Sequence, residues 1–370
     1  MNDSTPELHA RAAVTVEQKG EPGEFWALGF KNWILNVLTL TIYRFWAKTN
    51  TRRRLWASTI VNGDPLEYSG TGMELFKGFL LAILLFLPFG LAIFAAQLLL
   101  PPASAAGAVA LVYLVLFWLM GVAIFLARRY QMSRTVWRGV RFSQHGSPLA
   151  FGFETLSYTL LTAITLGWFG PAARMRLAGR LWSQTAFGDR RFRWERPPGD
   201  AGEPLYRSFA VAWAGVIVGY VGLIVAVMVP LMASQTDLGV DLPEVHKLLV
   251  PAGITAVVAI LLALIAAAWH AAVLIRCEAQ SVKLDGLSFT LTARPWSFFW
   301  LAVTNALLML LTLGIAAPVV QLRVVRYLAT RLGVTGTIDL AAVNQAAGRG
   351  PSQGEGLADG LDLSGVDIGL

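Results

Sequence analysis

The sequence predicts an all-α protein that crosses a membrane several times. Hydrophobic residues make up 55% of its 370 residues and charged residues only 14%, whereas about 25% of residues are charged in soluble domains. Four apolar stretches are each long enough to cross a bilayer, and three further apolar segments break at a shared position. We therefore expect two transmembrane helical hairpins and three repeated broken segments, with short amphipathic helices and β-turns on the cytoplasmic side.

Four stretches reach the roughly twenty residues that a transmembrane helix needs. They contain no Asp, Glu, Lys or Arg and are Phe79–Leu100, Ala105–Ala127, Phe209–Ala233 and Leu248–Ile275. Residues 101–104 join the first two, which predicts a tight hairpin over 79–127. Residues 234–247 join the other two, which form the second expected hairpin, over 209–275.

Three other apolar segments share one pattern and indicate an internal repeat. Each begins with a phenylalanine and has a threonine-led triplet fourteen residues later: Thr39-Leu40-Thr41 in 25–46, Thr165-Leu166-Gly167 in 151–173 and Thr312-Leu313-Gly314 in 298–320. A proline follows the triplet in the last two copies, and Gly and Pro so close together favour a kink or a turn. A constant offset of 147 residues relates these two copies without a gap, from Arg129 and Arg276 to Arg176 and Arg323.

The repeat predicts how the chain is divided. A polar N-terminal tail, 1–23, precedes a membrane domain, 24–340. Within that domain 24–78, 128–208 and 275–340 each hold a broken segment and a basic interfacial region, while 79–127 and 209–275 are the helical hairpins. Residues 341–370 are rich in Gly, Ala and Asp, which predicts a disordered C-terminal tail.

Basic residues distinguish two topologies for the broken segments. If all seven apolar segments crossed the membrane, Lys and Arg would be shared almost equally between the two sides, contrary to the positive-inside rule. If the broken segments enter and return on one side, nearly all of the 30 basic residues face the cytoplasm and only Lys247 lies opposite. We therefore favour four full spans, three re-entrant or interfacial segments and cytoplasmic termini, with seven spans as the alternative.

Part of the first repeat resembles a known family. The resemblance is to the YjgN-like family of bacterial inner-membrane proteins, which carry a domain of unknown function, and it rests on Thr39-Leu40-Thr41-Ile42-Tyr43-Arg44-Phe45-Trp46-Ala47-Lys48-Thr49-Asn50-Thr51-Arg52-Arg53 followed by Val61-Asn62-Gly63-Asp64-Pro65-Leu66-Glu67-Tyr68-Ser69-Gly70-Thr71. It extends over about residues 23–335, more loosely in the later copies. The resemblance implies a bacterial inner-membrane location and supplies no activity and no catalytic residue.

Arginines just past the membrane segments are the candidate contacts for lipid head groups. They are Arg52, Arg53, Arg54, Arg128, Arg129, Arg174, Arg176, Arg180, Arg323 and Arg326. Such side chains orient a protein by reaching the interface, and they also attract anionic lipids. Because the basic residues lie beside apolar segments, we expect membrane lipids as partners and no nucleic acid.

Three polar residues occupy equivalent positions inside the broken segments. Asn32, Tyr158 and Asn305 each lie seven residues before the threonine of the triplet. Polar side chains in register either line a cavity or form hydrogen bonds between helices. We favour hydrogen bonds between helices.

The sequence contains no recognisable catalytic motif. It has no phosphate-binding glycine loop followed by lysine, no His-Glu-x-x-His and no Gly-x-Ser-x-Gly. We expect a non-enzymatic inner-membrane protein without cofactor or metal, whose basic cytoplasmic face contacts anionic lipid or a partner. The alternative is a transporter of a small solute or lipid, with a pathway at the repeat interface.

Overall fold

The computed structural model describes residues 14–195, 204–235, 242–337 and 343. The chain forms two compact units. Unit 1 contains residues 1–196, 280–290 and 308–370, and unit 2 contains residues 197–279 and 291–307. Most of the two expected tails, 1–13 and 344–370, lies outside the described residues.

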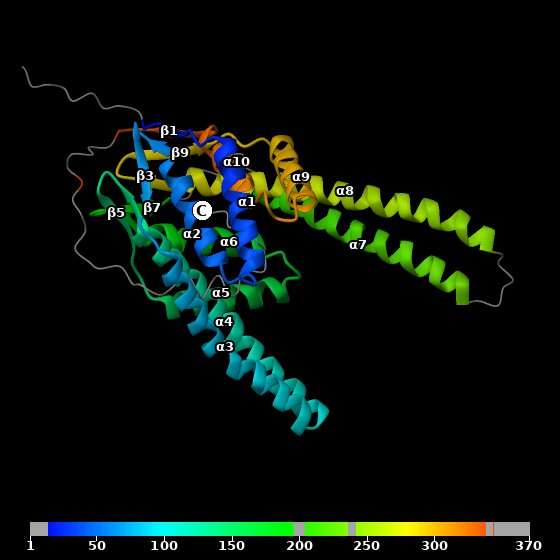
Figure 1. Cartoon of the computed structure of the whole chain (residues 1–370). Coiled ribbons are helices and arrows are strands. Elements are labelled where there is room, and N and C mark those ends of the chain that lie inside the picture. Colours follow the sequence, from blue (N-terminus) through cyan, green and yellow to red (C-terminus); the bar gives the residue numbers. More distant parts are fainter. Residues whose placement is uncertain (1–13, 196–203, 236–241, 338–342, 344–370) are drawn as a thin grey trace, which may run out of the picture. The chain divides into compact units, whose positions relative to one another are not determined.

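Unit 1 is built around a ten-stranded sheet, so the prediction of an all-α protein was wrong. The strands lie side by side in sequence order, and the pairs from β1 to β9 are antiparallel (Figure 1). Their bounds are β1 Val16–Gln18, β2 Thr59–Val61, β3 Asp64–Tyr68, β4 Thr135–Trp137, β5 Val140–Gln144, β6 Thr185–Phe187, β7 Arg190–Trp194, β8 Val282–Leu284, β9 Leu287–Leu291 and β10 Leu332–Thr335.

Four β-hairpins of identical length make up most of this sheet. Each has a strand of three residues, a turn of two and a strand of five. Both turn residues of the first two hairpins adopt positive φ, with 50° at Asn62, 89° at Gly63, 50° at Arg138 and 75° at Gly139. Two-residue turns of this kind match the right-handed twist of the flanking strands, which explains the Asn-Gly pair.

The sheet escaped the sequence analysis because each hairpin pairs with a distant one. Leu66 lies opposite Trp137, and Phe192 lies opposite Leu284. Two helices separate the partners in each case, so no local pattern reports the pairing. Strands of three to five residues are also too short to show a clear alternation of apolar and polar residues.

Five pairs of helices connect neighbouring strands of the sheet. They are α1 Pro22–Leu38 and α2 Arg44–Ala57 between β1 and β2, α3 Gly72–Leu99 and α4 Pro102–Arg134 between β3 and β4, α5 Pro148–Ile164 and α6 Gly170–Ser183 between β5 and β6, α7 Leu205–Gln235 and α8 Leu242–Ser281 between β7 and β8, and α9 Pro295–Leu311 and α10 Ala317–Ala329 between β9 and β10. Every pair therefore leaves one strand and returns to the next.

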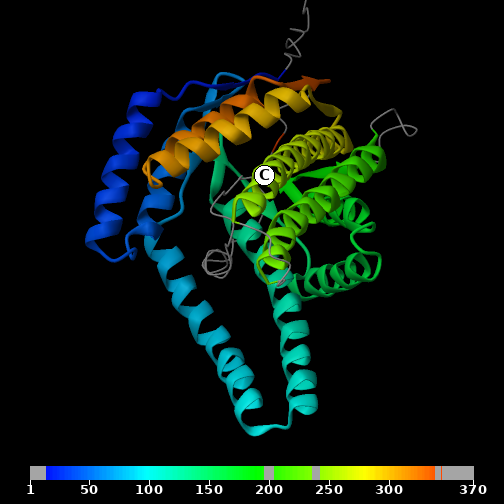
Figure 2. The same ribbon diagram turned by 90° about the vertical axis from the view of Figure 1, so that its right-hand side faces the viewer.

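Within the described residues, four helices are long and apolar enough to cross a membrane, by length and composition. They lie at Gly72–Leu99, Pro102–Arg134, Leu205–Met228 and Gly253–Ser281, and each covers most of one predicted stretch. Helices α3 and α4 form one elongated hairpin; they overlap in Figure 1, and Figure 2 shows the two arms apart and joined at the far end. Large apolar side chains on α3, such as Leu84 and Phe94, are exposed, which suits a lipid environment.

Each broken segment is two helices joined by a short turn at its threonine-led triplet. Thr39 Oγ1 donates to the carbonyl of Leu35 (2.7 Å) and accepts the N–H of Tyr43 (2.9 Å). Thr165 makes the same two bonds at 2.7 and 3.0 Å, and Thr312 makes them at 2.7 and 3.1 Å. A threonine thus ends one helix and begins the next in every copy.

Helix α10 packs against α1 in unit 1. The buried cluster at this contact contains Phe25, Leu55, Val319 and Leu322. A tight approach lies at Gly29, where a Cβ would lie 2.1 Å from the carbonyl oxygen of Ile315, in the turn that leads into α10. Only glycine therefore fits at this position of α1.

The apolar core of the sheet is a different cluster from the one between α1 and α10. Its buried members are Trp137, Phe187, Phe192, Val282, Leu284, Leu287 and Val343. The rings of Trp137 and Phe187, from two neighbouring hairpins, lie 5.3 Å apart. Hydrophobic burial therefore joins consecutive hairpins in addition to their backbone bonds.

Unit 2 contains the α7–α8 helical hairpin and most of α9. Gly215 of α7 faces Ala263 of α8, where an added Cβ would lie 3.1 Å from the alanine Cα. Small residues let membrane helices approach closely, and this contact has that character. Towards the start of α7, the hydroxyl of Ser208 lies 3.0 Å from Nδ1 of His270.

Candidate functional site

Three arginines make the same contact around a β-hairpin: each lies near the end of the helix before the hairpin and donates to a backbone carbonyl just before the helix that follows it. Arg53 donates to the carbonyl of Gly70 at 3.1 Å, and Arg129 donates to the carbonyl of Gly146. In unit 2, Arg276 donates to the carbonyl of Ala293 at 2.8 Å. The acceptor lies seventeen residues after the arginine each time, at the start of the helix that follows the hairpin. We call these three contacts the arginine clips.

The hairpin after α6 has a different contact at the equivalent position. Gly179 stands where the other copies have arginine, and a Cβ there would lie 2.8 Å from the indole nitrogen of Trp194. An indole ring therefore packs where a guanidinium lies in the other copies. Arg53, Arg129 and Arg276 each precede a strand by six residues, and this shared spacing is the signal of the contact in the sequence.

Two more of the predicted arginines are buried against aromatic rings. Arg52 is 5% exposed, and its guanidinium donates to the hydroxyl of Tyr68 at 3.5 Å. Arg128 is 9% exposed and stacks over Trp182 at 4.6 Å from the ring centroid. Such contacts stabilise the guanidinium inside the fold. These two side chains therefore contribute to packing and present little charge to a membrane surface.

Two predicted arginines tie helix ends to the segment that enters α1. Arg54 Nε donates to Glu24 Oε2 at 3.0 Å, and Arg326 of α10 donates to the carbonyl of Gly20. Arg323 lies half-buried on α10. The first and last helices of unit 1 are thus joined by polar contacts beside their apolar cluster.

Helix α6 carries three of the predicted arginines that are exposed; Arg53 and Arg54 of α2 are exposed as well. Arg174, Arg176 and Arg180 are all exposed on this helix of fourteen residues. The Arg176 guanidinium lies over Phe169 at 5.2 Å, and Arg180 forms an ion pair with Glu154 at 3.2 Å. We call these three residues the α6 basic surface.

The three equivalent polar residues are not brought to a shared cavity by the contacts they make. Asn32 is 5% exposed and its amide donates to Thr51 Oγ1 of the same helical pair, at 3.4 Å. The ring of Tyr158 packs on Phe169, also within its own pair, at 5.7 Å. Asn305 is buried in α9, in the other unit. For Asn32 and Tyr158 the contacts are those expected of residues that join two helices.

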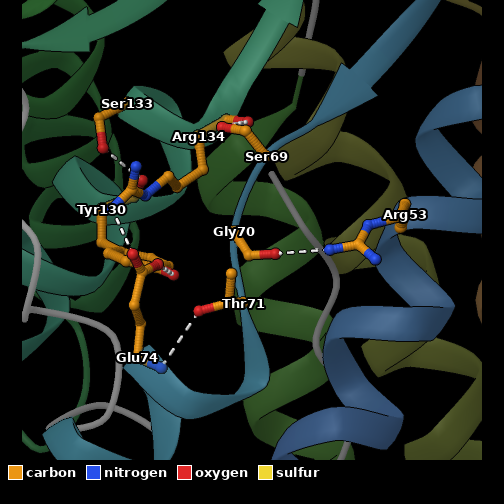
Figure 3. A network of polar contacts seen from close by, with 8 residues as sticks. All are labelled: Arg53, Ser69, Gly70, Thr71, Glu74, Tyr130, Ser133 and Arg134. Atoms are coloured by element: carbon orange, nitrogen blue, oxygen red, sulfur yellow. Dashed lines mark hydrogen bonds and ion pairs between the residues drawn. The ribbon is translucent and has the colours of Figure 1, made fainter.

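A polar network at the base of the α3–α4 hairpin was missed by the sequence analysis (Figure 3). Glu74 accepts a hydrogen bond from the hydroxyl of Tyr130 and forms an ion pair with Arg134 at 2.7 Å. Thr71 Oγ1 caps the helix by accepting the N–H of Glu74 at 3.4 Å. The spacing Thr-x-x-Glu before an apolar run is a known helix-start signature and could have located this site.

Comparison with known proteins identifies the family. A family model described as "Bacterial protein of unknown function (DUF898)" matches residues 13–360.

The chain belongs to the DUF898 family.

A second comparison agrees with this DUF898 membership. The inner membrane protein YjgN of Salmonella typhimurium is 31% identical over 68 residues. Those residues are 18% of this chain and 17% of that protein. The predicted resemblance to a YjgN-like family is confirmed. No solved structure matches this DUF898 chain.

Proposed function

We propose that this DUF898 protein is a non-enzymatic component of the inner membrane that presents a basic face to anionic lipid on the cytoplasmic side. The observation that carries the proposal is the single sheet to which every pair of helices returns. The four long apolar helices and the YjgN name of the relative support the inner-membrane location.

Hydrogen bonds between neighbouring strands support an arrangement in which both ends of each helical pair lie on one side of the membrane. Val16 of β1 lies opposite Val61 of β2, so the chain enters α1 and leaves α2 at the same place. Leu66 of β3 and Trp137 of β4 do the same for the two apolar helices α3 and α4. If α1 and α2 formed one complete crossing, β1 and β2 would face opposite sides and could not pair. The sheet therefore supports four crossings over seven.

The charge of the sheet side favours the cytoplasm. The strands and turns of unit 1 carry Arg138, Arg141, Arg190, Arg191, Arg193 and Lys283. Loops rich in Lys and Arg face the cytoplasm in bacterial inner-membrane proteins. The α6 basic surface belongs to the same unit, and each basic residue near an anionic leaflet contributes about 1 kcal/mol of attraction.

The transporter alternative receives less support. A pathway at the repeat interface would be lined by the equivalent polar residues, yet Asn32 and Tyr158 make their contacts within their own helical pairs. Broken helices also occur in transporters, but here the breaks close on themselves through threonine hydrogen bonds.

Reversing the charge of the α6 basic surface is expected to weaken binding of anionic lipid. The triple variant Arg174→Glu, Arg176→Glu and Arg180→Glu should reduce phosphatidylglycerol retained in native mass spectrometry by about tenfold or more, since three charges contribute roughly 3 kcal/mol at low salt. The matched triple lysine variant keeps the charge and should retain the lipid. Unchanged phosphatidylglycerol binding by the glutamate variant, or equal loss of phosphatidylcholine, would contradict the proposal.

A further inference from the structure

The turns of the three broken segments end in exposed apolar side chains. Leu40 is 84% exposed, Leu166 73% and Leu313 76%. Their backbone φ values of 48°, 51° and 48° lie in the left-handed region, which leucine rarely adopts. Next to them Ile164 and Leu311 are exposed as well. We call the turns 39–43, 165–169 and 312–316 the apolar tips.

The backbone N–H groups of the apolar tips bond to acceptors within the same broken segment. In the first tip the N–H of Thr41 donates to the carbonyl of Asn36 at 2.7 Å. The N–H of Gly167 and of Gly314 makes the equivalent bond in the other two, at 2.7 and 3.0 Å. Together with the threonine hydroxyl bonds, these contacts close each turn on itself. Irregular backbone enters hydrocarbon only when its polar groups have internal partners, and the N–H groups of the tips meet that condition.

The tips are all the same distance along the chain from the sheet. Helix α2 has 14 residues, α6 has 14 and α10 has 13 between the tip and the following strand. At 1.5 Å per residue each is about 20 Å long, whereas the 28 residues of α3 span about 42 Å. A tip carried on such a helix extends about half as far as a membrane-crossing helix.

Contacts between α2 and α3 give the level of the first tip. Arg53, at the base of α2, bonds to Gly70, and Arg44, at its other end, lies 4.7 Å from the ring centroid of Phe79. The two helices therefore run antiparallel along this stretch. Phe79 is the first residue of the apolar stretch of α3, so Leu40 lies about one helical turn further into the apolar region. Figure 2 shows that this helical pair ends well short of the far end of α3 and α4.

We propose that the three apolar tips insert into the acyl chains of the leaflet that faces the sheet, and that they do not cross to the other leaflet. The inference rests on the proposed function, in which both ends of every helical pair lie on the sheet side of the membrane. It adds what the tips contact, namely the acyl chains of a single leaflet. Acyl chains fit this surface because it is apolar, because its backbone N–H groups have internal acceptors, and because the unit that carries it contains two membrane-length helices. Insertion would remove the exposed leucine side chains of all three tips from water, which is favourable for apolar surface.

Nitroxide labels test the insertion directly in the full-length protein. Single cysteines replace Leu40, Leu166 or Leu313 in a Cys277→Ala background, reconstituted in nanodiscs of phosphatidylcholine alone. Collision rates with oxygen, which enters hydrocarbon, are compared with those of the polar nickel complex NiEDDA by power-saturation EPR. Labels at Ser183, exposed at the sheet end of α6, and at Leu91, exposed near the middle of the apolar stretch of α3, provide the shallow and deep references.

The expected result is oxygen-dominated collision at all three tips, at depths between those of Ser183 and Leu91. NiEDDA-dominated collision at any tip overturns insertion of that tip. Shielding from both reagents means that protein covers the tip and overturns the lipid assignment. A depth equal to or beyond Leu91 means that the segment crosses, which overturns the inference and the one-sided arrangement together. The nanodiscs contain only phosphatidylcholine, which has no net charge. The collision rates at the tips therefore do not depend on whether the α6 basic surface binds phosphatidylglycerol, and the two proposals can fail separately.

Discussion

Replacing Gly29 with alanine should lower the free energy of unfolding, although alanine is the better helix former. In an exposed helix position this change would gain roughly 1 kcal/mol. Here the new Cβ would lie 2.1 Å from the backbone oxygen of Ile315. A backbone atom cannot turn aside as a side chain does, so α1 and α10 must separate. Overpacking of this kind costs about 1–3 kcal/mol, which thermal unfolding of the purified protein in detergent would measure as a lower Tm.

Gly23 provides the matched control in the same helix. It belongs to α1, and no atom lies within 4 Å of a Cβ added there. Gly23→Ala should leave the Tm unchanged or raise it slightly. Equal Tm values for the Gly23→Ala and Gly29→Ala variants would show that α1 and α10 do not approach as closely as the structure has them.

Replacing Glu74 with alanine should have the second large effect. The hydroxyl of Tyr130, a residue only 1% exposed, would lose its acceptor, and Arg134 would lose its ion-pair partner. A buried donor left without a partner costs about 1–3 kcal/mol. The side chains of Glu74 and Arg134 are 26% and 20% exposed, so solvent moderates the ionic part. We expect a lower Tm and earlier proteolysis of the loops around the α3–α4 hairpin.

Tyr130→Phe separates the two parts of this network. Phenylalanine removes the donor together with its need for an acceptor, so the loss should be smaller than for Glu74→Ala. In the Glu74→Ala background, Tyr130→Phe should restore part of the lost stability. An additive double variant would show that the hydroxyl and the carboxylate are not coupled.

The apolar helices were the part of the fold most open to prediction from the sequence. Length and uninterrupted hydrophobicity determine a membrane-length helix locally, and the stretch that begins at Phe79 became most of α3. The turn at Thr165-Leu166-Gly167 was likewise visible, because glycine and a nearby proline disfavour a continuous helix. The sheet was not visible, because Leu66 and Trp137 become neighbours only after two long helices have folded back.

The sequence predicts where the basic residues lie along the chain, but it does not predict which backbone groups they contact. Their position beside apolar segments predicted exposure to head groups, and Arg174 and Arg176 are indeed exposed. Arg53, which is also exposed, and Arg129, which is half-buried, donate to backbone carbonyls seventeen residues away. The choice between the two roles depends on which acceptor the hairpin brings near, and that is a property of tertiary structure.

The order of the strands in the sheet has a consequence for how this protein is made. Each strand pairs with the one synthesised immediately before it, apart from the helices between them. The sheet can therefore grow at one edge as successive helical pairs leave the ribosome and enter the membrane, with no strand waiting for a later one to be threaded between its neighbours. The same property lets a duplicated helix-and-hairpin unit join the series without disturbing the strands already paired. Contact between α10 and α1 joins the last helical pair to the first, so it can form only after all five pairs have been synthesised.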